Sequence, residues 1–384
     1  MANENTLTGL IPTIYIAADR VLREQIGFLG AVYMDPSGDM VAKDQNITYP
    51  IVPTIAATDV APAAVPSEPP GAALGYGQMT ISKVKKAPFV WKGEEQFSIG
   101  GIYDKVKEDQ FAQAFRVLVN EVELDLFLAA KRNASRAYGT PGTTPFATAG
   151  VLTDVAEIRR ILVENGAWTS DMHMVLNSTS GSKIRGTQAN LFKVNEAGSA
   201  ELLRDGGLGR LEGFDMHESA AIVSHTKGTG TSYVVNGSHA IGATTLVAKT
   251  GSGTILYGDV LALEDDTTDP THKYVVNTGI AAAGSLVLGG PGLRKAQTDG
   301  KTITVGNDYT GNFAFERNAI HLLTRVPKLP TEGALGEHEI ITDPFSGISF
   351  LVSIYPAYHE VIVEVSLAWG TKAVKSDAIA TLLG

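Results

Sequence analysis

The chain has 384 residues, enough for about two or three domains, and its 44% hydrophobic and 19% charged residues are typical of a globular protein. It contains no cysteine, which excludes disulfides, thiolate catalysis and cysteine-bound zinc or iron–sulfur centres. The net charge of −10 argues against a general nucleic-acid binder, whose surface is basic, although an acidic protein can still enclose DNA.

The first 34 residues predict an arm. Within it, Ile14 and Val21 belong to the apolar face of a short amphipathic helix that ends near Gly27. Two interpretations stay open, because the helix can pack on its own domain or dock on another subunit. We see no secretory signal and no apolar run of the roughly 20 residues that a membrane helix needs, so a cytosolic location is expected.

Residues 45–95 predict a long two-stranded excursion with an irregular tip. Residues 47–51 have the pattern of one strand, and residues 79–91 that of the returning strand. The prolines between them disfavour a helix or a regular ladder and favour an extended course. A disordered linker is the alternative, but the strand-like segments on both sides favour the excursion.

The strongest predicted helix covers residues 104–137. Its apolar residues recur three or four positions apart, at Phe111, Phe115, Leu118, Val122, Leu126 and Ala129. We expect Gly139 and Pro141 to end it. At 1.5 Å per residue the helix would be about 50 Å long. A single apolar stripe on so long a helix is typical of a helix that lies across a sheet, and no sustained heptad indicates a coiled coil.

Residues 153–223 alternate between helical and strand patterns, which indicates α+β organisation. The expected elements are a helix from Thr153, a buried strand at 172–176, a short helix at 178–185, a glycine-rich loop at 206–213 and a strand at 214–217. Thr153 is expected to cap the first helix, and Gly166 to end it.

Residues 224–312 predict a small antiparallel β-domain inserted into this α+β region. The segment is rich in Gly and Thr, has no helical period, and contains short apolar runs separated by Gly, Asn and Asp. The predicted strands are 233–235, 244–248, 255–257, 260–263, 274–276, 286–288 and 303–305. After the insertion, residues 313–324 continue the host domain, and residues 348–354 and 361–368 predict central strands.

Motifs for catalysis are largely absent from the sequence. GxSxG, HExxH and GxxxxGK[ST] do not occur. His217 with Glu218, and His338 with Glu339, begin a zincin motif but lack its second histidine, and residues 207–209 lack the third glycine of a dinucleotide fingerprint. We therefore expect no catalytic, cofactor-binding or metal-binding residues, and no enzymatic activity.

Three groups of polar residues have functional as well as structural interpretations. The acidic residues Asp265, Asp266 and Asp269 share a loop of the insertion. Three interpretations stay open: a calcium site, a solvated turn and a contact with a neighbouring subunit. The solvated turn is favoured. The histidines of the insertion do not cluster, so metal binding is disfavoured at His225, His239 and His272. The hairpin lysines fit an exposed strand face better than a polyanion site: Lys83, Lys85 and Lys86.

An arm, a long hairpin, a long helix and a mixed terminal domain with a β insertion together resemble a tailed-phage major capsid protein of the Hong Kong 97 type. The segment "SLAWGTKAVKSDAIATLLG" (366–384) looks like the final strand of that family. "GRLEGFDMHESAAI" (209–222) and "MVLNSTSGSKIRG" (174–186) resemble its strand before an edge loop and its strand–Asn–helix element. "TGSGTILYGDVLALE" followed by "KYVV" resembles the Gly–Asp turn of an inserted telokin-like barrel, and "GNFAFERNAIHLLTRVPKLP" (311–330) the return to the host domain. The resemblance is closest to coat proteins of short-tailed phages that carry this barrel.

The resemblance implies an α+β capsid fold in six parts. They are an N-terminal arm (1–35), an extended hairpin or E-loop (36–98), a peripheral domain with the spine helix (99–149), the first part of an axial domain (150–223), an inserted β-barrel (224–312), and the second part of the axial domain with the C-terminal strand (313–384).

The resemblance also implies a structural function. Copies of the chain would assemble as pentamers and hexamers into an icosahedral head that encloses double-stranded DNA without sequence-specific binding. A scaffolding protein and a portal would be partners, with no cofactor and no membrane, and assembly in the host cytoplasm would give the virion capsid. Some proteins of this fold cross-link a lysine to an asparagine between subunits, and the three hairpin lysines are in the appropriate place. The alternatives are a tail-tube or decoration protein, and an enzyme with an unrecognised site.

Overall fold

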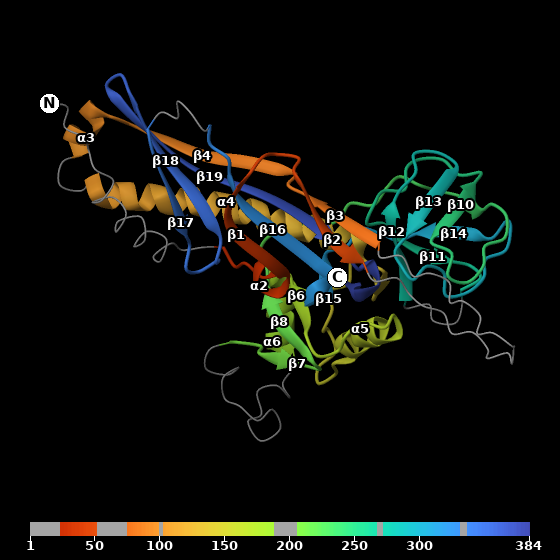
Figure 1. Ribbon diagram of the computed structural model, residues 1–384. Helices are drawn as coiled ribbons and strands as arrows, with labels where there is room; N and C mark the ends of the chain where they lie inside the picture. Colours follow the sequence, from red (N-terminus) through yellow and green to blue (C-terminus); the bar gives the residue numbers. More distant parts are fainter. Residues whose placement is uncertain (1–23, 52–74, 100–102, 188–205, 267–271, 331–335) are drawn as a thin grey trace, which may run out of the picture.

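The structure, a computed structural model, describes residues 24–51, 75–99, 103–187, 206–266, 272–330 and 336–384 (Figure 1). The predicted arm helix up to residue 23 and the proline-rich hairpin tip at 52–74 lie outside the described residues. Within these ranges, no helix combines the length and the apolar character needed to cross a membrane.

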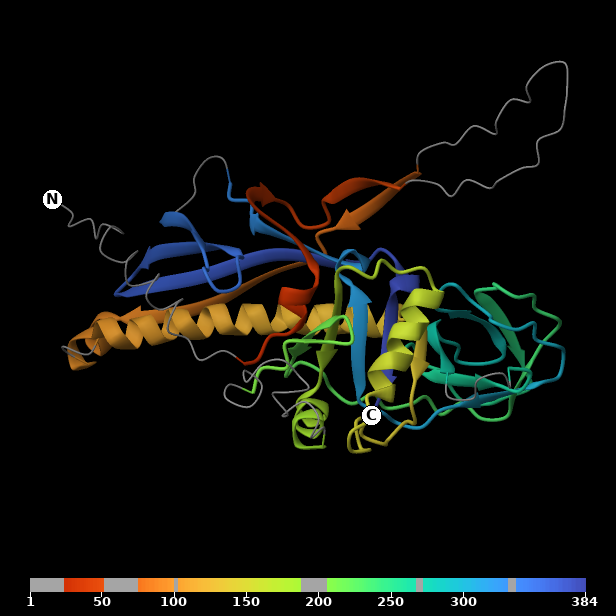
Figure 2. The same cartoon turned by 90° about the horizontal axis from the view of Figure 1, so that it is seen from below.

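A six-stranded sheet and a long helix form one end of the molecule. The strands are β1 (Tyr33–Val41), β4 (Lys83–Lys92), β16 (Ile320–Pro327), β17 (Glu337–Thr342), β18 (Ser349–Ala357) and β19 (Glu360–Ala373). The central strand is β19, which pairs with β4 on one side and with β18 and β16 in succession on the other. Helix α4 (Tyr103–Asn133) lies along β4 and β19 (Figures 1 and 2).

The apolar stripe of α4 packs on this sheet, as predicted. Phe111 and Phe115 are fully buried and meet Phe89 of β4 and Phe350 of β18 edge-to-face, with ring centroids 5.0 and 4.9 Å apart. Such aromatic pairs contribute about 0.5–1.5 kcal/mol each beyond the area they bury. The indole of Trp369 on β19 donates a hydrogen bond to Asp125 of α4 over 2.8 Å, which fixes the position of the helix on the strand.

The end of the predicted helix was wrong by four residues. The chain leaves the helix after Asn133, because the backbone N–H and the hydroxyl of Ser135 both donate to the Ile379 carbonyl. Strand β5 (Arg136–Tyr138) then pairs with β20 (Ile379–Leu383). Gly139, expected to stop the helix, instead follows this strand with a φ of 107°. Tertiary pairing therefore ended the helix before the local stop signal did.

The excursion is present as a two-stranded sheet of β2 (Asn46–Ile51) and β3 (Gly75–Thr80), which projects from the rest of the molecule (Figure 2). The prediction of one returning strand at 79–91 was wrong, because that strand breaks between Thr80 and Lys83. Its second half, β4, belongs to the large sheet, where it pairs with β19 over ten positions. A short helix, α3 (Gly93–Ile99), connects β4 to α4.

A second sheet lies beside the first and is extended by the insertion. Its host strands are β5, β20, β15 (Gly311–Glu316), β6 (Met172–Leu176), β8 (Phe214–Glu218) and β7 (Arg210–Leu211), in that order. Helix α5 (Thr153–Glu164) ends before Gly166, as predicted, and packs on β20 and β5 with Val155, Ile158 and Leu162 buried. Thr153 does not cap this helix, because Leu152 occupies the N-cap position and Thr153 is the first helical residue. Asn177 accepts a hydrogen bond from Ser180 N at the start of α6 (Ser178–Thr187).

The insertion is an antiparallel barrel. Its strands are β9 (Tyr233–Val235), β10 (Thr245–Lys249), β11 (Val260–Leu263), β12 (His272–Thr278), β13 (Gly284–Leu288) and β14 (Thr302–Val305). They follow the order β11-β14-β9-β10-β13-β12, and pairing of β11 with β12 closes the ring. The expected strand at 255–257 is present only as an isolated bridge between Ile255 and Ile280. Strand β12 also pairs with β5, so the barrel continues the host sheet.

The turn formed by Gly258 and Asp259 anchors the barrel at its junction with the host. Asp259 is buried and accepts hydrogen bonds from the imidazole of His225 over 2.7 Å and from the backbone of Gly228 and Leu256. Gly258 has a φ of 85°, and an added Cβ would lie 3.0 Å from the Lys131 side chain of α4. The glycine therefore permits both the left-handed backbone and the close approach to the helix.

We predict that residues 224–312 fold when excised. The barrel has a core of its own, because every buried member of its cluster, from Tyr233 to Ile303, comes from the insertion itself. The expected result is a dispersed NMR spectrum and a cooperative thermal transition. A fragment with the spectrum of an unfolded chain would contradict the prediction. Stability below that of the whole chain is expected, because β12 loses its pairing with β5.

Candidate functional site

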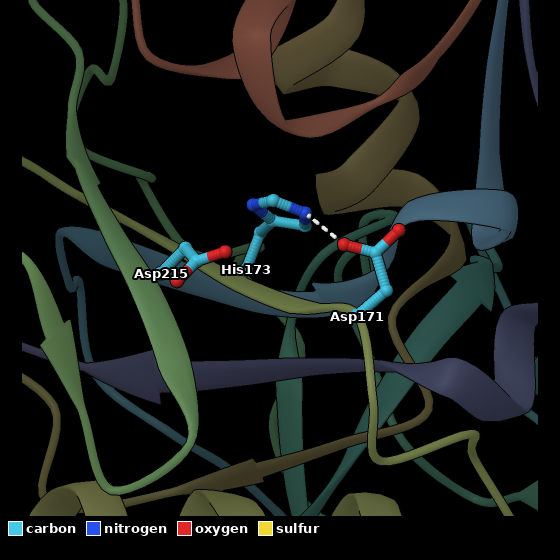
Figure 3. A group of neighbouring side chains, drawn as sticks. All are labelled: Asp171, His173 and Asp215. Atoms are coloured by element: carbon cyan, nitrogen blue, oxygen red, sulfur yellow. Dashed lines mark hydrogen bonds and ion pairs between the residues drawn. The ribbon is translucent and has the colours of Figure 1, made fainter.

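A polar cluster lies where β6 and β8 run side by side. The two strands are parallel, with His173 opposite Asp215 and Val175 opposite His217. Asp171 immediately precedes β6. Figure 3 shows the side chains of Asp171, His173 and Asp215 gathered on one side of these strands. Among the described residues, these three form a close group. One imidazole nitrogen of His173 and one carboxylate oxygen from each aspartate all lie within 4.8 Å of one another.

His173 is the centre of this cluster and is buried. Its Nε2 lies 2.8 Å from Asp171 Oδ1, and its Nδ1 lies 3.0 Å from His217 Nε2. Arg317, which follows β15, places its Nε 2.9 Å from Asp171 Oδ2 and its Nη2 3.0 Å from His173 Nε2. The cluster thus joins the start of β6, the middle of β8 and the end of β15.

Burial and the guanidinium of Arg317 shift the pKa values of the cluster. Burial lowers the pKa of His173, and the charge of Arg317 adds to this effect, while Asp171 opposes it. Burial and the neighbouring His173 lower the pKa of His217. Burial raises the pKa of Asp171, but the hydrogen bonds and charges of His173 and Arg317 outweigh it, so that pKa lies below its usual value. At neutral pH the cluster therefore holds neutral imidazoles and an ionised Asp171.

Sequence reasoning did not single out this cluster. Its residues are spread over three segments far apart in the chain, and no single spacing brings them together. Two weak signals were present: a histidine inside the otherwise apolar strand β6, and an Asp and a His two positions apart on β8. Only the parallel register of β6 and β8 joins the two signals.

The residues that the sequence did single out lie apart from one another. His217 belongs to the cluster, but its neighbour Glu218 contacts Arg185 instead. His338 contacts Ser353 through Nδ1. The histidines of the insertion occupy separate surroundings: His225 binds Asp259, His239 contacts the backbone of Asn236, and His272 lies between Arg160 and Arg294.

The acidic loop of the insertion is not a simple solvated turn. Asp266 is buried, accepts a hydrogen bond from the Tyr274 hydroxyl over 2.6 Å and forms an ion pair with Arg294 at 2.9 Å. Asp265 accepts hydrogen bonds from the backbone and the hydroxyl of Thr298. Asp269 lies outside the described residues. For Asp266 the interpretation as a solvated turn was therefore wrong, because its buried carboxylate links Tyr274 and Arg294 within the barrel.

The hairpin lysines lie on β4 and make ion pairs within the subunit. Lys83 pairs with Asp125 over 2.7 Å, Lys85 with Glu121, and Lys86 with Glu364 over 2.8 Å. The hydrogen bond and the charge of Glu364 raise the pKa of Lys86. Two of the pairs tie β4 to α4, which gives these lysines a structural role.

Large apolar side chains are exposed at extremities of the molecule. Tyr76 on β3 is 73% exposed, Phe97 on α3 is 91% exposed, and Tyr358 in the turn between β18 and β19 is 89% exposed. A two-stranded sheet alone is only marginally stable in water. The hairpin and these aromatic residues are therefore candidate contacts with other subunits.

Comparison with known proteins identifies the fold. No protein-family profile matches the chain, and no curated protein does. Among solved structures, the capsid structure of cyanophage P-SCSP1u is 9% identical, with 94% of this chain and 89% of that chain covered and a TM-score of 0.51. The chain has the Hong Kong 97-type capsid fold.

Two further solved structures match this chain with lower TM-scores. The mature capsid of bacteriophage PhiM1 is 10% identical over 93% of this chain and 86% of that one, with a TM-score of 0.49. A chain of Mycobacterium phage Che8 is 12% identical over 94% and 91%, with a TM-score of 0.48. The match to the cyanophage capsid confirms the α+β capsid fold predicted from sequence. The boundaries of its six parts and the telokin-like character of the barrel stay predictions.

Proposed function

We propose that the chain is the major capsid protein of a tailed phage, a structural subunit rather than an enzyme. The observation that carries this proposal is the match of nearly the whole chain to a phage capsid subunit, at 94% and 89% coverage. The 6% of the chain outside this match, about 23 residues, is shorter than either the barrel or the long helix α4. A tail-tube or decoration protein would not be expected to share the whole arrangement.

The exposed features of the subunit fit self-assembly. The hairpin of β2 and β3 projects from the molecule, and its Tyr76 is exposed (Figure 2). A shell supplies the missing partners for such elements, because each subunit receives from its neighbours the contacts that it offers to others. Many weak contacts repeated over a closed shell give high collective stability.

The partners follow from the same proposal. Subunits would assemble as pentamers and hexamers, with a scaffolding protein and a portal, in the host cytoplasm. The shell would enclose double-stranded DNA without sequence-specific binding. The net charge of −10 is consistent with a shell that does not bind its DNA tightly, because tight binding of phosphates requires a basic surface.

Electron microscopy of the expressed chain tests this function. We expect closed shells of uniform diameter, with the chain alone or together with a scaffolding protein. Shells would exclude the enzyme alternative as the main function, and open tubes would favour a tail-tube protein. Small oligomers of uniform size under both conditions would contradict the proposal.

A further inference from the structure

The cluster around His173 has the composition of a metal site. It offers one imidazole nitrogen and two carboxylates, from Asp171 and Asp215, within 4.8 Å (Figure 3). Both carboxylate side chains are about half exposed, whereas His173 is buried, so the group opens to solvent on its acidic side. Mixed nitrogen and oxygen ligands of this kind suit Zn²⁺ and its first-row neighbours, whereas Mg²⁺ and Ca²⁺ prefer oxygen alone.

The hydrogen bonds of His173 allow two arrangements of its protons. In one, Nε2–H donates to Asp171 and Nδ1 accepts from His217. In the other, Nδ1–H donates to His217 Nε2, and the lone pair of Nε2 faces Asp171 Oδ1 at 2.8 Å. Two acceptors this close repel each other unless a cation lies beside both. In the second arrangement His217 is the outer partner that fixes the tautomer of a ligating histidine.

The guanidinium of Arg317 is positioned as that cation. It reaches the second oxygen of Asp171 over 2.9 Å and the same Nε2 of His173 over 3.0 Å. Its side chain is 37% exposed, so it can swing into solvent. The Arg317 backbone stays anchored, because its N–H donates to the Asp171 carbonyl.

We propose that Asp171, His173 and Asp215 bind one divalent transition-metal ion, with Zn²⁺ as the representative ion, in place of the Arg317 guanidinium. Two tetrahedral ligands each about 2.0–2.2 Å from one Zn²⁺ lie about 3.3–3.6 Å apart. The 2.8 Å separation of His173 Nε2 and Asp171 Oδ1 has to open to reach this range. Solvent water completes the coordination on the exposed side. The ion would join the start of β6 to β8.

Calorimetric titration of the full-length chain with Zn²⁺ tests the proposal, after removal of bound metal with a chelator. We expect saturable binding of one ion per chain and much weaker binding of Mg²⁺. Asp215→Asn should weaken Zn²⁺ binding by about tenfold or more, because it removes a ligand charge. Arg317→Met should strengthen binding, because it removes the competing cation. A merely structural Arg317 would not produce this gain.

A matched control and a second readout complete the test. His359, in the exposed turn between β18 and β19, has a φ of 57°, which asparagine tolerates, so His359→Asn should leave both fold and binding unchanged. The visible absorption of Co²⁺ should appear in the parent chain and decrease in Asp215→Asn. If Asp215→Asn does not fold, Asp171→Asn serves in its place. Undetectable binding to the parent chain, full binding to these carboxamide variants or weaker binding to Arg317→Met would overturn the proposal.

Discussion

Removing residues 60–75 should abolish particle assembly while leaving the subunit folded. The hairpin of β2 and β3 contributes little to the buried core beyond its base, where Met79 packs with Leu323 and Ala368. The deleted segment precedes that base, so the free energy of unfolding should change little. Assembly depends on contacts that a subunit cannot make alone, and the sequence of this segment, rich in Pro and Ala, favours an extended course suited to them. Particle yield by sedimentation and microscopy, and thermal unfolding of the subunit, are the two measurements.

A replacement of equal length distinguishes the effect of the segment's length from the effect of its side chains. Replacing residues 60–75 with a flexible Gly/Ser segment of equal length keeps the number of residues but removes the prolines and the apolar side chains. We expect this variant also to fail in assembly. Assembly restored by Gly/Ser would show that length alone matters, and an unchanged yield from the deletion would contradict the role of the hairpin.

Replacing Glu123 with alanine should destabilise the subunit by about 3 kcal/mol or more. Glu123 lies on α4, is 2% exposed, and accepts hydrogen bonds from three successive backbone N–H groups of residues 27–29, over 2.6, 2.8 and 3.0 Å. The hydroxyl of Ser219, after β8, donates to the same carboxylate over 2.6 Å. One side chain thus joins the short helix α2 (Phe28–Ala31), where the arm meets the core, to α4 and to the second sheet. Alanine leaves these buried donors without partners.

Glu121, two positions earlier on the same helix, is the matched control. It pairs with Lys85 at the surface, and exposed ion pairs contribute about 1 kcal/mol or less, so Glu121→Ala should have a small effect. Urea unfolding followed by circular dichroism measures both variants. Equal effects of the two substitutions would contradict the role assigned to the buried carboxylate. Because α2 lies within the predicted arm (1–35), Glu123→Ala should also reduce particle yield in conditions where the subunit stays folded.

Elements with a clear apolar period were predictable from the sequence. The stripe of α4 from Phe111 to Leu126 and the alternation along β19 indicate which face is buried, whatever the partner. The short strands of the barrel were also predictable, because β-branched runs between glycines leave few other conformations. The capsid fold itself was implied by the resemblance of these elements, in their order along the chain, to a known family.

Elements whose limits depend on distant partners were not predictable. The end of α4 is set by the pairing of β5 with β20, and the break between β3 and β4 lies where the partner strand changes from β2 to β19. The local signals at Gly139 and along residues 79–91 predicted other limits. They were overridden because hydrogen bonds to a remote strand outweigh a propensity of a few tenths of a kcal/mol per residue.

The candidate metal site shows the same division. The sequence by itself determined the α+β class, the long helix, the inserted β-domain and the absence of cysteine chemistry, because these depend on composition and on periods that are read along the chain. Only the tertiary structure decided that β11 pairs with β12 to close the barrel, that Glu123 accepts hydrogen bonds from the backbone of α2, and that Asp171, His173 and Asp215 meet. These features depend on strand register and on side chains from remote segments, and short-range patterns carry no information about either.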